Sequence, residues 1–238
     1  MDAVVLAGGR GTRLSQHVPN VPKPMACVAG RPFIDFLLHA LVDEGVTRII
    51  LSVGHLADQI VAHVGSRFRG VPVVYAREDE PLGTGGAIRL SLKLASTPRV
   101  IVVNGDTFLD APLTRFFRFC SDAQAKVGVV VRLVPEASRY GACVLEGTTV
   151  VQFGEKTGVG PGLINAGIYC LERQLLEGME LPNAFSFEQD VLAAKLQLLK
   201  PVGFAVDGYF IDIGIPGDYD RAQSELPKAF SSRFSGRL

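Results

Sequence analysis

The chain has 238 residues, of which 47% are hydrophobic and 20% charged, a composition typical of a globular protein and not of a disordered one. Its 24 Lys and Arg residues balance its 24 Asp and Glu residues, so bulk charge does not indicate a nucleic-acid partner. The four cysteines form no CxxC pair, and the sequence shows neither a basic leader nor an apolar run long enough to span a bilayer. These features predict a cytoplasmic protein without a membrane partner.

The first half of the chain alternates between strand and helix patterns. Continuous apolar runs predict strands at 2–7, 47–53, 72–76 and 99–106, and helical spacing of apolar residues predicts helices at 32–45, 55–66 and 85–95. Strands without a polar face suit a sheet that is covered on both sides. We therefore expect an α/β fold with a mostly parallel, doubly wound central sheet.

The pattern changes after about residue 125. Shorter strand-like segments separated by turn residues predict a small antiparallel β insertion. A helix at 187–199, strands at 201–206 and 208–213 and a closing helix at 217–226 complete the expected elements. We expect one domain over 1–226, whose two halves meet near residue 125, and a C-terminal tail over 227–238.

Ligands of open α/β sheets bind at the carboxyl ends of the strands, which here are followed by loops 8–24, 77–86 and 104–110. The first loop begins GGRGTRL. It lacks the third glycine of a dinucleotide fingerprint and the GK[ST] of a Walker A loop. What remains is a glycine-rich nest with two arginines, which could hold a polyphosphate, or else an ordinary turn with solvated arginines. Lys23 follows in VPKP, where two prolines stiffen the loop that presents it.

The second loop contains EDEPLGTGGA. Gly83, Gly85 and Gly86 would allow a ligand to approach the backbone closely, and Glu78 or Glu80 could accept the two adjacent N–H groups of guanine. A glycine-rich helix start with acidic residues at its positive end is the structural alternative.

Two aspartates follow predicted strands, Asp106 in NGD and Asp212 in FIDIG. Both could bind one Mg²⁺, which prefers one or two carboxylates together with phosphate oxygens; each could instead be a helix cap or turn residue. Glu155, Lys156 and Asn165 offer groups for sugar hydroxyls and a phosphate. None of the four histidines has metal-ligand spacing, and none is assigned a catalytic role.

Seven segments, in order over residues 2 to about 226, resemble the sugar-1-phosphate nucleotidyltransferases. They are LAGGRGTRL, VPKPM, EPLGTGGA, NGD, FGEK, NAGIY and FIDIGIPGDY. The resemblance implies a Rossmann-like three-layer fold, Mg²⁺, and transfer of a nucleotidyl group to a sugar 1-phosphate. The short length and the FIDIGIP ending are most similar to the subgroup that joins GTP to D-glycero-α-D-manno-heptose 1-phosphate.

The resemblance also implies a nucleotide-binding half (1–125), a sugar-phosphate-binding half (126–226) and roles for individual residues. Arg13, Lys23 and Asp106 would be catalytic, and Asp106 and Asp212 would bind the metal. The nucleotide would contact Leu6, Ala7, Gly8, Gly9, Gly11, Thr12, Glu78, Pro81, Gly83 and Thr84. The sugar phosphate would contact Asn104, Gly141, Glu155, Lys156 and Asn165.

The chemistry agrees with these residue types, because a phosphate nucleophile is already ionised at neutral pH and needs no general base. Alternatives are a mannose-1-phosphate guanylyltransferase, a uridylyl- or thymidylyltransferase, a non-catalytic nucleotide-sugar sensor and an NAD-dependent oxidoreductase. The last is weakened by the failed fingerprint, and the sensor by the presence of every expected charged residue. The sequence does not decide between a monomer and a homo-oligomer.

Overall fold

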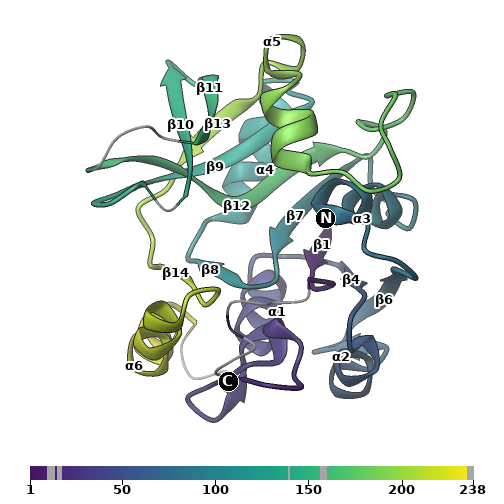
Figure 1. Cartoon of the computed structure of the whole chain (residues 1–238), viewed down its shortest axis with the longest axis vertical. Coiled ribbons are helices and arrows are strands. Elements are labelled where there is room, and N and C mark those ends of the chain that lie inside the picture. The colour runs from purple at the N-terminus through teal and green to yellow at the C-terminus, as the bar shows by residue number, and fades with distance from the viewer. Residues whose placement is uncertain (10–13, 15–17, 139, 156–159, 235–238) are drawn as a thin grey trace.

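A ten-stranded mixed sheet runs through the structure, a computed structural model that describes residues 1–9, 14, 18–138, 140–155 and 160–234 (Figure 1). From edge to edge its strands are β10 (Gly141–Glu146), β11 (Thr149–Glu155), β13 (Val202–Ala205), β9 (Val127–Val134), β12 (Gly162–Glu172), β7 (Arg99–Asn104), β1 (Asp2–Leu6), β4 (Arg48–Val53), β6 (Val71–Arg77) and β5 (Arg67–Phe68). Two-residue strands β2 (Cys27–Val28) and β3 (Arg31–Pro32) form a separate small hairpin.

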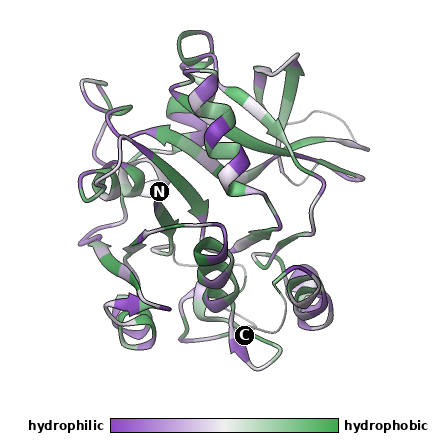
Figure 2. Ribbon diagram, turned by 180° about the vertical axis from the view of Figure 1, so that it is seen from behind, coloured by the Kyte–Doolittle hydropathy of each residue, from purple (hydrophilic) through white to green (hydrophobic). Residues whose placement is uncertain are grey.

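Four neighbouring strands, β7, β1, β4 and β6, are parallel and contain the apolar runs. Val4 of β1 lies opposite Ile50 and Val102, and all three are buried in one core cluster. The next residue, Val5, is buried in a second cluster on the other face of the sheet. Both faces are therefore covered, which explains why these strands are apolar along most of their length (Figure 2).

Helices cover the two faces unequally. The cluster that contains Val5 is covered by α1 (Phe33–Asp43), α2 (Ala57–Val64), α4 (Leu113–Asp122) and α6 (Pro216–Arg233). The cluster that contains Val4 is covered by α3 (Gly83–Leu92), the π-helix η2 (Phe187–Ala193) and α5 (Leu196–Leu199). Within the described ranges, no helix combines the length and apolar character needed to cross a bilayer.

The second half of the sheet is mostly antiparallel. Strand β12 pairs antiparallel with both β7 and β9, and β10 pairs antiparallel with β11, whereas β13 and β9 are parallel. The expectation of a mostly parallel sheet with a small antiparallel insertion therefore describes only the part from β7 to β6. The short segments after residue 125 do not form an insertion beside the sheet, because β12 pairs with β7 and extends it.

The C-terminal region differs from its predicted pattern. Helix α6 continues through Pro227 to Arg233, so the predicted tail begins too early. Phe230 is buried in the core and packs edge-to-face on Phe36, with ring centroids 5.4 Å apart, which explains why this part of the chain is ordered into the helix. The predicted helix at 187–199 is also divided, into η2 and α5, and α4 was not predicted.

Candidate active site

A cleft of about 500 Å³ lies where β1, β4, β6 and β7 end. It has this position because the carboxyl ends of parallel strands meet at one edge of the sheet. Nine residues predicted to contact substrates line it together: Leu6, Gly8, Gly9, Glu78, Pro81, Gly83, Thr84, Asn104 and Asp106. Ala7 is buried and extends β1 by donating its N–H to the Ser52 carbonyl at 2.8 Å. Gly11, Thr12, Arg13 and Lys156, and the side chain of Glu155, lie outside the described residues.

Lys23 lies between the two predicted metal ligands. The short 3₁₀ turn η1 (Lys23–Met25), with Pro22 before it and Pro24 within it, presents a lysine side chain that is only 15% exposed. Its Nζ forms an ion pair with Asp106 and lies 3.9 Å from Asp212 Oδ1. The three charges thus form one group at the edge of the cleft.

A small antiparallel ladder brings the two aspartates together across a hundred residues of sequence. Strand β14 (Phe210–Asp212) pairs with β8 (Thr107–Leu109), with Asp212 opposite Thr107. The Ile213 N–H also donates to the Asp106 carbonyl at 3.0 Å. Burial, and after it the charge of Asp106, raises the pKa of Asp212 above its ordinary value.

Gly214 is the residue that lets Lys23 approach. Its N–H donates to Asp212 Oδ1 at 2.7 Å, and a Cβ atom at this position would collide with Lys23 Nζ and lie 2.8 Å from Asp212 Oδ1. The glycine in FIDIG is therefore required by close packing against the lysine, because any larger residue would displace one of the charges.

The donor set at this position fits a magnesium ion. Asp106 and Asp212 present two carboxylates side by side, and no group of three His, Cys, Asp or Glu side chains suited to a metal occurs in the described part of the chain. Mg²⁺ is commonly bound through one or two carboxylates, with phosphate oxygens and water as its other ligands. Two adjacent carboxylates beside a cleft provide that arrangement.

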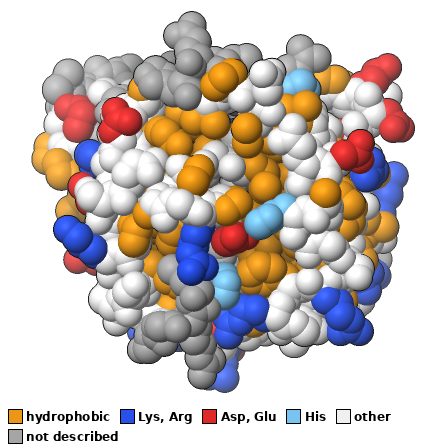
Figure 3. All heavy atoms as spheres, turned by 90° about the horizontal axis from the view of Figure 1, so that it is seen from below, with side chains coloured by type: hydrophobic (Ala, Val, Ile, Leu, Met, Phe, Trp, Pro, Cys, Tyr) orange, Lys and Arg blue, Asp and Glu red, His pale blue; other side chains and the backbone are white. Residues whose placement is uncertain are grey.

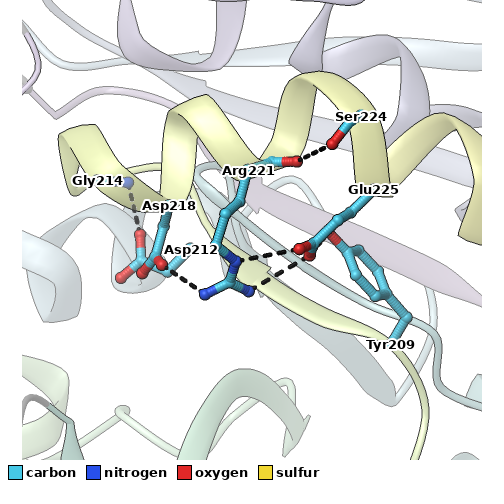
Figure 4. Close-up of polar contacts among 7 residues, drawn as sticks. All are labelled: Tyr209, Asp212, Gly214, Asp218, Arg221, Ser224 and Glu225. Atoms are coloured by element: carbon cyan, nitrogen blue, oxygen red, sulfur yellow. Dashed lines mark hydrogen bonds and ion pairs between the residues drawn. The ribbon is translucent and has the colours of Figure 1, made fainter.

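A second cleft, of about 290 Å³, opens on the Asp212 side of this group and is lined by Arg132, Tyr140, Phe210 and Asp218, among others. One wall is fixed by α6 (Figure 4). Arg221 donates to Asp218 at 2.9 Å and to both oxygens of Glu225, and the Tyr209 hydroxyl donates to Glu225 at 3.2 Å. Asp106 lines the first cleft and Asp212 lines the second, so the charged group separates two spaces.

Glu78 is held in a defined orientation at the wall of the first cleft. Its Oε1 accepts from the Ser52 hydroxyl at 3.2 Å and its Oε2 from the Leu82 N–H at 3.2 Å. Gly8 lies so close that a Cβ there would collide with Glu78 Oε1. A carboxylate has about four acceptor positions, so each oxygen can accept one further donor.

The glycines of 83–86 have a different role from the predicted one. Only Gly83 lines the cleft, with φ of +68°. A Cβ on Gly85 would collide with the Phe185 ring, and one on Gly86 would lie 2.6 Å from the Asn183 carbonyl oxygen. A Cβ on Gly83 would likewise lie 2.5 Å from the Phe185 carbonyl oxygen, so all three glycines let α3 pack against the segment before η2.

Two of the predicted acceptor residues, Asn165 and Gly141, lie together but are not among the residues that line either cleft. Asn165 is in β12, and a Cβ on Gly141 at the start of β10 would lie 4.0 Å from the Cβ of Asn165. Asn104 lines the first cleft and packs against β12, where Gly167, with φ of +72°, leaves room for the Asn104 amide: a Cβ there would lie 2.6 Å from Asn104 Nδ2.

A sequence model described as nucleotidyl transferase matches residues 2–229. The chain belongs to the nucleotidyl transferase family. It is 38% identical over 226 residues to D-glycero-alpha-D-manno-heptose 1-phosphate guanylyltransferase of Aneurinibacillus thermoaerophilus, covering 95% of this chain and 98% of that protein. It is 37% identical over 220 residues to the protein of the same name from Campylobacter jejuni, covering 92% and 97% of the two chains.

A solved structure is similarly close. The crystal structure of HddC from Yersinia pseudotuberculosis complexed with GMP-PN has a TM-score of 0.83 and 37% identity to this nucleotidyl transferase. The match covers 94% of this chain and 99% of that one. The nucleotidyltransferase fold expected from the sequence is therefore confirmed.

Sequence reasoning missed part of the nucleotidyl transferase cleft. Gly54 and His55 line it, as do Asp79 and Ala87. Glu80, which the sequence offered as the alternative to Glu78, lines it too. His55 follows the carboxyl end of β4 in the same way that the three predicted loops follow their strands, so the rule for strand ends would have found it. Glu188, described below, gave no signal, because an acidic residue in a predicted amphipathic helix is ordinarily solvated.

Proposed function

We propose that this nucleotidyl transferase moves GMP from GTP to D-glycero-α-D-manno-heptose 1-phosphate and releases pyrophosphate. The observation that carries the proposal is the placement of Lys23 with Asp106 and Asp212 between two clefts. A transferase that joins two phosphorylated substrates needs two adjoining sites and positive charge where they meet. The relatives named heptose 1-phosphate guanylyltransferase support the choice of substrates.

In the proposed reaction an oxygen of the sugar 1-phosphate forms a bond to the α-phosphorus of GTP. The bond from that phosphorus to the bridging oxygen of the β-phosphate breaks, and pyrophosphate leaves with the electron pair. The attacking oxygen is already ionised, so the chain has no proton to remove. Its task is to align two anions and to offset their charge, which Lys23 does at the junction of the clefts and Arg13 would do on the leaving phosphates.

Asp106 and Asp212 would hold Mg²⁺. When bound there, the ion would neutralise charge on the phosphate oxygens. Lys23 lies within the same group and would remain the protein's own cation for the α-phosphate. The glycines and Thr12 of the first loop, with Leu6 and Ala7, would place the triphosphate through backbone N–H groups.

Glu78 would select guanine. Its carboxylate, oriented by Ser52 and Leu82, can accept the adjacent N1–H and N2–H groups of that base. Uracil and thymine present carbonyl oxygens on either side of a single N–H, and a carbonyl facing a carboxylate in a cleft is unfavourable. Pro81, Gly83 and Thr84 would complete the wall around the base.

The acceptor would lie against Asn104, Gly141 and Asn165, with Glu155 and Lys156 on its hydroxyls and phosphate. Asn104 Oδ1 is buried and has no hydrogen-bond partner among the described residues. An unpaired buried amide oxygen beside a cleft is costly, and a sugar hydroxyl would satisfy it. The free, buried thiols of Cys120, Cys143 and Cys170 agree with a reducing, cytoplasmic setting.

The test is pyrophosphate release from the purified protein with Mg²⁺, four nucleoside triphosphates and two acceptors, heptose 1-phosphate and mannose 1-phosphate. We expect GTP with the heptose to give the highest kcat/KM, and omission of the sugar to abolish release. A preference for UTP or dTTP would contradict the assignment of the base, and a preference for mannose 1-phosphate would contradict that of the acceptor.

A further inference from the structure

The π-helix η2 contains Glu188, whose carboxylate accepts hydrogen bonds from side chains of helix α3 and strand β12. π-helical turns are rare and occur frequently at functional sites. Glu188 is half-buried and is neither a cleft residue nor one of the charged residues described above. Hydroxyl groups from three other elements or loops donate to it, so it joins parts of the chain that are distant in sequence.

On one side Glu188 fixes the start of α3. Its Oε2 accepts from the Thr84 hydroxyl at 2.6 Å and from the Ser186 hydroxyl at 3.2 Å. The Phe187 N–H donates to Thr84 Oγ1 at 2.9 Å, so the Thr84 hydroxyl is held from both directions. Thr84 lines the nucleotide cleft.

On the other side Glu188 reaches the acceptor strand through Tyr169. The Tyr169 hydroxyl donates to Glu188 Oε1 at 3.0 Å and accepts from Asn165 Nδ2 at 2.7 Å. The Gly167 N–H in turn donates to Asn165 Oδ1 at 3.1 Å. Tyr169 is completely buried, and burial raises its pKa well above the ordinary value, so its hydroxyl remains protonated and available as a donor.

The directions of the hydrogen bonds that link Glu188, Tyr169 and Asn165 follow from the carboxylate of Glu188. An ionised carboxylate only accepts, so Tyr169 must donate to it and must accept from its other neighbour. Asn165 therefore turns its NH₂ group toward Tyr169 and its oxygen toward the Gly167 N–H. A reversed Asn165 amide would place two donors against each other at Gly167, which makes the arrangement unique.

We propose that Glu188 is a positioning residue that couples the nucleotide cleft to the acceptor site. It holds Thr84 on one side and, through Tyr169, sets the orientation of the Asn165 amide on the other. This inference rests on the proposed function for the identity of the two substrates, but the hydrogen-bond chain itself does not depend on that identity. A ligand that orders Thr84 therefore favours, through Glu188, the ordered form of Asn165, and a ligand that orders Asn165 favours the ordered form of Thr84.

The test compares three variants by steady-state kinetics with each substrate varied in turn. Tyr169→Phe cuts only the acceptor branch, and we expect it to raise KM for the sugar 1-phosphate about tenfold, the effect of losing one hydrogen bond to a charged group. Thr84→Val cuts only the nucleotide branch and should raise KM for GTP by a similar factor. Glu188→Gln keeps the size of the side chain but replaces one acceptor with a donor, and should raise both KM values.

A binding measurement tests the coupling directly. The Kd of a non-hydrolysable GTP analogue is measured by calorimetry with and without saturating sugar 1-phosphate. In the unaltered protein we expect the acceptor to change that Kd, and in Glu188→Gln we expect the change to disappear. The matched control is Gln189→Ala, an exposed neighbour on the same helix, which should preserve the change in Kd and both KM values.

Glu188→Gln with only one KM altered, or with the coupling intact, would overturn the inference, as would equal effects in Gln189→Ala. Thermal unfolding is measured for each variant. Where Glu188→Gln fails to fold, the separate effects of Tyr169→Phe on the KM for the sugar 1-phosphate and of Thr84→Val on the KM for GTP decide the matter. Failure of the proposed function is seen separately, as an unaltered protein that prefers another pair of substrates. The variants are then measured with that pair.

Discussion

Removing the positive charge of Lys23 is the most direct perturbation of the junction between the two clefts. Lys23→Met keeps most of the side chain's length and removes only the ammonium group. In the unaltered protein that group pairs with Asp106 and lies 3.9 Å from Asp212, with only 15% of the side chain exposed. Two unit charges at about 4 Å interact by about 4 kcal/mol at an effective dielectric constant near 20.

Only the part of this energy that acts on charge in the transition state lowers the barrier. Removing one preorganised donor at such positions costs about 10²–10³ in kcat, which corresponds to about 2.7–4 kcal/mol. We therefore expect Lys23→Met to lose about 10²–10³ in kcat. The KM for GTP should change less, because the contacts proposed between the triphosphate and the backbone of the first loop would remain.

The assay is pyrophosphate release at saturating substrates, with thermal unfolding to confirm that the variant is folded. The control is Lys126→Met, which removes an exposed lysine directly before β9 that lines neither cleft, and should leave kcat unchanged. If the folded Lys23→Met protein turns over within about tenfold of the unaltered protein, the lysine does not act on the transferred phosphate. The assignment of Lys23 would then be refuted.

Three further predictions concern Gly214, Glu78 and His39. Gly214→Ala should displace Lys23 and lower kcat at least about tenfold, whereas Gly217→Ala, where a Cβ meets nothing within 4 Å, should not; equal kinetics would contradict the packing argument. Glu78→Gln should lower kcat/KM for GTP by about 10–10² and reduce the preference for GTP over UTP, because the NH₂ group of the glutamine would face either Ser52 or Leu82. The measurement is kcat/KM for each of the four nucleoside triphosphates. Burial, and then the Arg69 charge, lowers the pKa of His39, so the folded protein binds fewer protons there and loses stability as pH falls below about 6.5. Figure 3 shows one face of the molecule, on which His side chains lie near Lys, Arg, Asp and Glu side chains. His39→Gln should therefore reduce the fall in Tm between pH 7 and pH 5, and an unchanged fall would show that other groups cause it.

The parallel part of the fold could be predicted because local pattern and final environment agree. The runs around Val4, Ile50 and Val102 have no polar face, and the sheet buries both of their sides. Their carboxyl ends then place the loops in one cleft without further information. The antiparallel part could not be predicted in the same way, since nothing local indicates that β12 will pair with β7 and not form a separate sheet.

The two aspartates are an intermediate case. Their position after predicted strands suggested a shared site, but the contact depends on β14 pairing with β8, more than a hundred residues earlier. That pairing is a tertiary choice, and neither strand is long enough to specify it by its own pattern. The need for Gly214 is visible only once Lys23, from a third segment, lies against it.

The glycines at 85 and 86 show why a motif can be found correctly and explained wrongly. Their spacing marked the loop as functional, yet their physical role is to admit Phe185 and Asn183, the residues that lead into η2. This contact fixes the segment from which Glu188 reaches Thr84 at 2.6 Å. The glycines therefore act on the nucleotide cleft indirectly: they let the second half of the chain hold the first turn of α3, and a larger residue at either position would separate the two ends that Glu188 joins.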